Sequence, residues 1–98
     1  MKATLIKNLT GFQGDARLYQ VAPPIKYTDY NDAGEEEAHE TSHVVVSGAN
    51  VPFTGPETYI FPSNEEGEII SWMELSGSFR GPINHAKALR CAGYETNE

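Results

Sequence analysis

The stretch H-V-V-V-S-G-A-N-V at positions 43–51 sets the centre of the predicted fold. It begins with three consecutive valines at positions 44–46, and β-branched side chains favour extended backbone. Because successive side chains of a strand point to opposite faces, an unbroken apolar run predicts a strand covered on both sides. We therefore place this strand centrally in a sheet and expect Gly48 to introduce a bulge or bend.

Two more extended segments precede this strand. Residues 3–7 (ATLIK) are rich in β-branched side chains, and residues 16–22 (ARLYQVA) alternate in a strand-like way, with a glycine-bounded loop at 11–14 between them. Pro23 and Pro24 are expected to end the pairing, because neither can donate a ladder hydrogen bond. A strand that resumes beyond them would lie at a sheet edge.

The segment that follows the central strand predicts a hairpin. Residues 58–61 and 68–72 are β-prone, and Gly67 in the connection at 62–67 can adopt the positive φ that closes a longer loop. A helix over 63–75 is the alternative, because Ser63 and Glu66 have capping-box spacing. We favour the hairpin, since Gly67 would fall in the first turn of that helix.

A helix is expected near the end of the chain. Asn84 is the candidate N-cap, and residues 86–90 are good helix formers. With Gly93 as the left-handed residue that ends the helix, Tyr94 and Leu89 form the contact pair of a Schellman motif.

This helix is short, so packing has to stabilise it, and we expect it to bury Cys91 beside Ala88, Leu89 and Ala92. The predicted class is α+β: a mostly antiparallel sheet of four to five strands with one C-terminal helix packed on a face. The length of 98 residues gives one small domain, residues 1–98.

The charge is unevenly distributed. The net charge is −7, which disfavours direct nucleic-acid binding, and residues 27–74 hold eleven acidic side chains and neither lysine nor arginine. Residues 28–42 are almost without apolar side chains, so we expect a mobile acidic loop there. Glu35, Glu36 and Glu37 in this loop are candidate contacts for a basic partner, or for electrostatic mimicry of nucleic acid.

The chain has one cysteine, no apolar stretch long enough to cross a membrane, and no signal-peptide pattern at its start. These features predict a cytoplasmic protein without membrane association.

The letters H-E-T-S-H at positions 39–43 match the H-E-x-x-H zinc motif, in which Glu40 would activate water bound between His39 and His43. The motif requires a helix. Here His43 leads into the valine run, and residues four apart on a strand are separated by about 13 Å. Zinc hydrolysis is therefore only an alternative, in which His85 or a carboxylate would be the third ligand, and we expect no cofactor.

A loop at 77–81 presents Phe79 and Arg80 near Trp72, a combination found at interaction hot spots. We favour the plainer interpretation, an interior Phe79 beside a solvated Arg80, and keep Trp72, Phe79 and Arg80 as candidate binding residues.

Short motifs along the chain (GDARLYQV, VVVSGANVPFTGPETYIFP, W-x-EL-x-GSFRG and H-x-KAL-x-x-AGY) resemble a group of small uncharacterised acidic proteins from actinobacteria and their phages. The resemblance implies an intracellular accessory protein, encoded by a phage or its host, and it offers no catalytic residues to carry over to this chain. We therefore expect function through a protein partner, with zinc hydrolysis and nucleic-acid mimicry as alternatives. The partner, the strand order and the oligomeric state are not predicted.

Overall fold

The computed structural model describes residues 1–9, 15–52, 55–71, 75 and 77–96. These residues form six strands and one helix: β1 (Lys2–Leu9), β2 (Asp15–Tyr30), β3 (Glu36–Val51), β4 (Gly55–Ser63), β5 (Phe79–Arg80), α1 (His85–Cys91) and β6 (Glu95–Thr96). The sheet order is β5-β4-β3-β2-β1-β6. All neighbours are antiparallel except β1 and β6, which pair in parallel. The predicted α+β class, with a mostly antiparallel sheet, is confirmed, but the described sheet has six strands rather than four to five, because the two-residue strands β5 and β6 are added at its edges.

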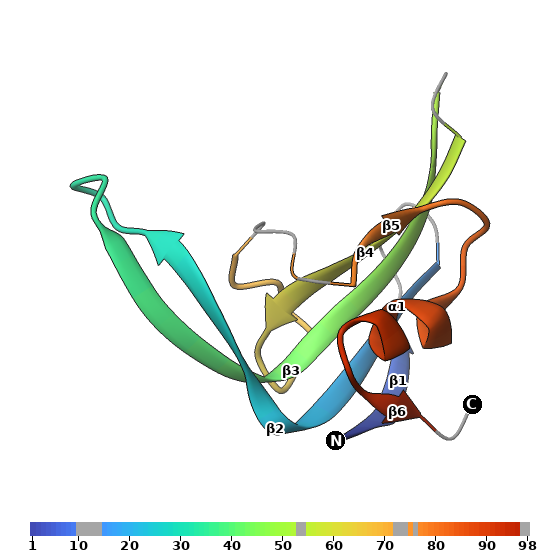
Figure 1. Ribbon diagram of the computed structural model, residues 1–98, viewed down its shortest axis with the longest axis horizontal. Coiled ribbons are helices and arrows are strands. Elements are labelled where there is room, and N and C mark those ends of the chain that lie inside the picture. The colour runs from blue at the N-terminus through green and yellow to red at the C-terminus, as the bar shows by residue number, and fades with distance from the viewer. Residues whose placement is uncertain (10–14, 53–54, 72–74, 76, 97–98) are drawn as a thin grey trace.

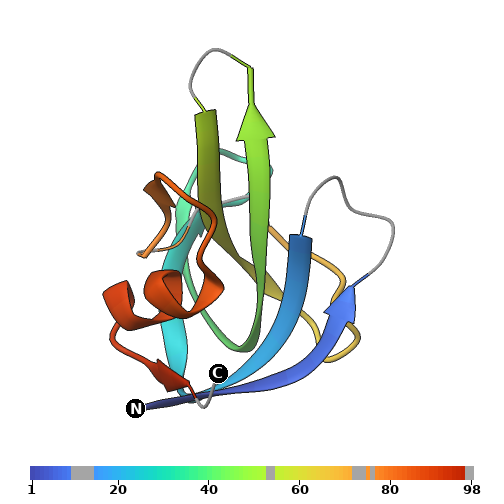
Figure 2. The same cartoon turned by 90° about the vertical axis from the view of Figure 1, so that its right-hand side faces the viewer.

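The valine run lies in the middle of this sheet, and both of its faces are covered. Val44 and Val46 pack into a core that includes Leu89 of α1. Val45 points to the opposite face and packs in a smaller cluster with Leu18. Figures 1 and 2 show α1 over one face, near both ends of the chain. The prediction of a central strand buried on both sides is therefore confirmed.

The bulge expected at Gly48 is not present in the pairing of β3 with β4. The pairing of β3 with β4 runs without a register shift from His43 to Val51, so Gly48 introduces no bulge into this ladder. Instead, a Cβ at position 48 would collide with Cγ2 of Ile83, in the segment that leads into α1. The glycine therefore allows a close approach between the sheet and that segment.

The prediction that residues 28–42 form a loop is wrong, because most of them belong to strands. Residues 28–30 belong to β2 and residues 36–42 to β3, and a short turn at 31–35 joins them. We call residues 25–41 the arm; Figure 1 shows it leaving the rest of the sheet and ending far from both termini. Composition misled the prediction because cross-strand hydrogen bonds join backbone groups and do not require apolar side chains.

The two prolines interrupt β2 without ending it. Pairing with β3 shifts register between Gln20 and Ile25 and then continues to Tyr30. The Ala22–Pro23 peptide bond is cis. We call residues 21–25 the elbow, because the ribbon changes direction there (Figure 1).

The segment after β4 folds back as a tight turn. Asn64 and Gly67 close it, and an isolated bridge joins Ser63 to Ile69. Residues 63–71 contain no helix, so the preference for a hairpin over a helix is correct for this range. In place of a second strand, however, the described residues form only the isolated bridge at Ile69. Trp72, the last residue of the predicted second arm, lies outside the described residues.

The helix has the predicted ends. The side chain of Asn84 accepts a hydrogen bond from the Lys87 amide, and Gly93 has a φ of 95°. The Tyr94 amide donates to the Leu89 carbonyl at 2.9 Å, which completes the Schellman motif. The prediction for Cys91 is wrong, because its side chain is exposed: α1 turns Ala88 and Leu89 toward the sheet instead.

Candidate functional site

The arm is a two-stranded ribbon without strand neighbours. Pairing between β1 and β2 stops at Ala22, and pairing between β3 and β4 stops at His43. Among the described strands, residues 25–30 and 36–41 therefore pair only with each other. Both outer edges of the ribbon carry backbone groups that no described strand satisfies.

A single asparagine organises the tip of the arm. Oδ1 of Asn31 accepts hydrogen bonds from the amides of Ala33 and Glu35, at 2.9 and 3.0 Å. Nδ2 of Asn31 donates to Glu37 at 2.9 Å, and Gly34 adopts a φ of 77°. The turn is therefore built by local polar contacts, which explains why it needs no apolar residue.

The predicted acidic contacts all lie on this arm. Glu35 ends the turn, and Glu36 and Glu37 begin β3, all three with exposed side chains. The arm contains six acidic residues and one lysine, for a balance of −5 with histidine neutral.

One face of the arm holds a mixed aromatic and charged cluster. The rings of Tyr27 and His39 stack with centroids 5.5 Å apart, and Nε2 of His39 lies 3.6 Å from a Glu37 oxygen. Asp29 is directly opposite Glu37 in the ladder. The pKa of Asp29 is lowered mainly by a hydrogen bond from the Ser71 hydroxyl and, to a smaller extent, by one from the Tyr30 amide. Ser71 thereby links the arm to the segment that follows β4.

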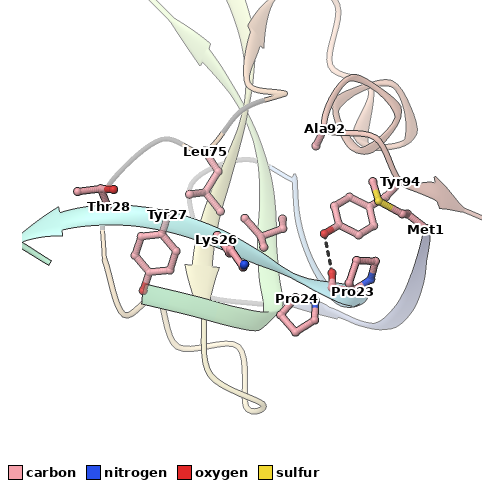
Figure 3. Close-up of a pocket in the computed structure, with 10 residues that line it drawn as sticks. Met1, Pro23, Pro24, Lys26, Tyr27, Thr28, Leu75, Ala92 and Tyr94 are labelled. Atoms are coloured by element: carbon pink, nitrogen blue, oxygen red, sulfur yellow. Dashed lines mark hydrogen bonds between the residues drawn. The ribbon is translucent and has the colours of Figure 1, made fainter. Parts of the chain in front are cut away.

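A groove of about 450 Å³ lies at the elbow, where the arm leaves the sheet. We call it the elbow groove. Residues 23–28 of β2 form one wall, and Met1, Leu75, Ala92 and Tyr94 form the other (Figure 3). Its walls thus bring together parts of the chain that are distant in sequence.

Tyr94 holds the two walls of the elbow groove together. Its hydroxyl donates to the carbonyl oxygen of Pro23 at 2.6 Å, as the dashed line in Figure 3 shows. Burial raises the pKa of the Tyr94 hydroxyl, because desolvation penalises the phenolate. Burial and, to a smaller extent, the charge of Asp29 raise the pKa of Tyr27 on the opposite wall.

The histidine motif does not form a zinc site of the H-E-x-x-H type. His39, Glu40 and His43 all lie on β3, where residues four apart are separated by about 13 Å rather than one helical turn. His85 is buried at the start of α1. Within the described parts of the chain, no three His, Cys, Asp or Glu side chains are grouped so that they could hold a metal ion.

Phe79 and Arg80 form β5 rather than a loop, and pair with Thr58 and Glu57. Phe79 packs partly against the core, and the ammonium group of Lys87 lies 4.8 Å from its ring centroid. Arg80 is exposed. Its Nε lies 3.0 Å from a carboxylate oxygen of Glu57, whose side chain is only 5% exposed.

Glu57 and Arg80 border a smaller cavity of about 260 Å³. They lie on β4 and β5, which do not contribute to the arm. The structure therefore does not bring Phe79 and Arg80 together with Glu35, Glu36 and Glu37 on one element. Of the remaining candidate, Trp72, nothing is described.

Sequence reasoning missed the elbow groove and the ribbon. One signal for the ribbon was available: N-D-A-G-E at 31–35 has the same asparagine-to-glycine spacing as N-E-E-G-E at 64–68. Oδ1 of each asparagine accepts hydrogen bonds from two backbone amides, and each glycine has a positive φ. No comparable pattern marks the groove.

Comparison of the chain with protein-family models, with curated proteins and with solved structures found no match. The resemblance to small acidic actinobacterial and phage proteins therefore stays a prediction. In the described part of the chain, no helix has the length and apolar character needed to span a bilayer.

Proposed function

We propose that this protein is a small accessory protein that acts by binding a protein partner, and that the arm is its binding surface. One observation carries the proposal: residues 25–41 project as a paired ribbon without strand neighbours in the described sheet, and they carry a balance of −5. Exposed ribbon edges are used to bind other chains, and a rigid ribbon presents its side chains at lower entropic cost than a loop.

The charge of the arm selects the kind of partner. Acidic side chains within a Debye length of about 8 Å reinforce one another at physiological salt, so a basic protein surface is the complementary partner. The same charge opposes pairing between the arms of two copies of this chain. The resemblance noted above implies a partner in the cytoplasm of an actinobacterial host, so an extract of such cells is the one to use.

The test is affinity capture from such an extract with three forms of the full chain. The arm variant carries Glu35→Lys, Glu36→Lys and Glu37→Lys. The matched control carries Glu65→Lys, Glu66→Lys and Glu68→Lys, which reverse the same number of exposed charges at the second asparagine turn. We expect the wild type and the control to retain the same protein, and the arm variant to lose it.

Raised salt should weaken the capture, because the proposed attraction is electrostatic. Equal recovery by all three forms, or recovery of nothing by any of them, would contradict the proposal.

A further inference from the structure

The elbow groove follows the edge of a strand rather than its face. Six consecutive residues of β2, from Pro23 to Thr28, line it. Alternate side chains of a strand point to opposite faces, so a groove on one face would be lined by every second residue. Lining by an unbroken run places the groove beside the backbone of β2 (Figure 3).

The edge of β2 that lines the groove is the same edge that pairs with β1 earlier in the strand. Lys2 pairs with Ala22, so β1 covers β2 only up to the elbow, and no described strand covers residues 23–28 on that side. In an antiparallel ladder, alternate residues direct their N–H and C=O groups away from the existing partner. Pro23 and Pro24 have no N–H to offer, so the available edge begins at Ile25.

The opposite wall of the groove presents apolar side chains beside this strand edge. Leu75 is 6% exposed, and Ala92 packs partly against the same core. The volume of about 450 Å³ suits side chains, since ligand pockets span about 300–1,000 Å³. A strand edge next to a pocket with apolar residues on one wall suits an extended peptide, in which backbone hydrogen bonds give affinity and alternate side chains give specificity.

We propose that an extended segment of the protein partner adds to β2 as a strand at residues 25–28, with an apolar side chain in the elbow groove. This inference rests on the proposed function and names its binding mode. The adjoining arm has a balance of −5, so the segment carries lysine or arginine next to its apolar residue. The added strand would lie beside β2 on the same side as β1, beyond the point where β1 pairing ends at Lys2.

The first test uses a synthetic peptide of alternating valine and lysine, titrated into the isotope-labelled full chain. We expect backbone amide shifts and slower hydrogen exchange at residues 25–28. The matched control peptide carries N-methyl groups on its valine amides, which removes those donors and leaves the side chains unchanged. It should bind at least about tenfold more weakly, since each lost hydrogen bond removes a sizeable part of the affinity.

A second test fills the groove. Ala92→Phe places a large side chain in the wall that also holds Leu75. Ala86→Phe is the control, because Ala86 lies in α1 and does not line the groove. Peptide binding should fall at least about tenfold in the first variant and stay within about twofold in the second. If Ala92→Phe does not fold, the N-methylated peptide decides the question.

Several results would overturn strand addition: equal binding of the two peptides, binding of neither, or amide protection along Thr4–Leu9 of β1 instead of residues 25–28. These failures are distinguishable from failure of the proposed function. If Ala92→Phe retains the captured partner that the arm variant loses, strand addition is wrong and partner binding stands. If the peptide adds at residues 25–28 and no partner is captured, the proposed function is wrong and the groove assignment stands.

Discussion

Tyr94 and Pro23 are 71 positions apart in the chain, and the hydroxyl of the first donates to the carbonyl oxygen of the second at 2.6 Å. This contact joins the segment after α1 to the elbow of β2, at the point where the arm leaves the sheet. Tyr94 is 4% exposed, whereas Pro23 is exposed, so the hydrogen bond between them is partly buried.

Tyr94→Phe should lower the free energy of unfolding by about 1 kcal/mol, because the ring stays packed while the hydrogen bond is lost. Urea denaturation measures the change. Tyr30→Phe is the control, because Tyr30 is 60% exposed on the arm. Equal unfolding midpoints for the two variants would show that the Tyr94 hydroxyl contributes nothing at the elbow.

Stability should fall in alkaline solution. The pKa of Tyr94 lies above its ordinary value of 10.0 because the hydroxyl is buried. The unfolded chain therefore ionises first, so this stabilisation is complete below pH 10.0 and is lost as the pH rises through the higher folded pKa. Unfolding curves recorded from neutral to alkaline pH should show a shallower decline for Tyr94→Phe than for the wild type, and parallel curves would contradict the assignment.

Ser71→Ala should raise the pKa of Asp29 toward its ordinary value of 3.8, because the Ser71 hydroxyl is the main group that favours the carboxylate. In the wild type this stabilisation is present above pH 3.8 and is lost as the pH falls through the lowered folded pKa. A carbon-detected NMR titration of the Asp29 carboxyl measures the change. Ser47→Ala is the control, because Ser47 lies on β3 outside the arm, and it should leave the pKa of Asp29 unchanged.

Gly48→Ala should destabilise the fold by about 1–3 kcal/mol, since the new methyl group collides with Ile83. The penalty should shrink when Ile83→Ala is already present, because that change vacates the space. A double-mutant cycle by urea denaturation measures the coupling between the two positions. Additive effects would show that the two residues do not compete for the same space.

Arg80→Ala should destabilise the protein by about 1–3 kcal/mol, because it removes the Nε group 3.0 Å from the buried Glu57 carboxylate. Arg90→Ala is the control, since Arg90 is exposed in the last turn of α1. Adding Glu57→Gln should recover part of the loss caused by Arg80→Ala, because the amide is neutral. If the two arginine variants unfold alike, the pair contributes little to stability.

The features that the sequence predicted correctly depend on neighbouring residues. The N-cap at Asn84 and the Schellman motif at Gly93 depend on contacts within a few positions, so the residue types are sufficient to indicate them. The valine run at 44–46 predicts burial on both faces for the same reason, because three apolar side chains in succession cannot avoid either face.

The arm shows where local composition misleads. Residues 28–42 have too few apolar side chains to predict burial, and they form a ribbon without it, because the sheet at Val44–Val46 extends β3 and Asn31 closes the turn. The asparagine-to-glycine spacing shared with residues 64–67 was the available signal.

The sequence by itself determined the α+β class, the central strand, the ends of the helix and the acidity of the segment that became the arm. Only the tertiary structure decided that Cys91 faces outward and that Met1, Leu75 and Tyr94 meet residues 23–28 in one groove. The physical reason is separation along the chain. Which side of a short helix is buried, and which distant segments share a surface, depend on how the elements pack, and no local pattern of residues specifies that packing.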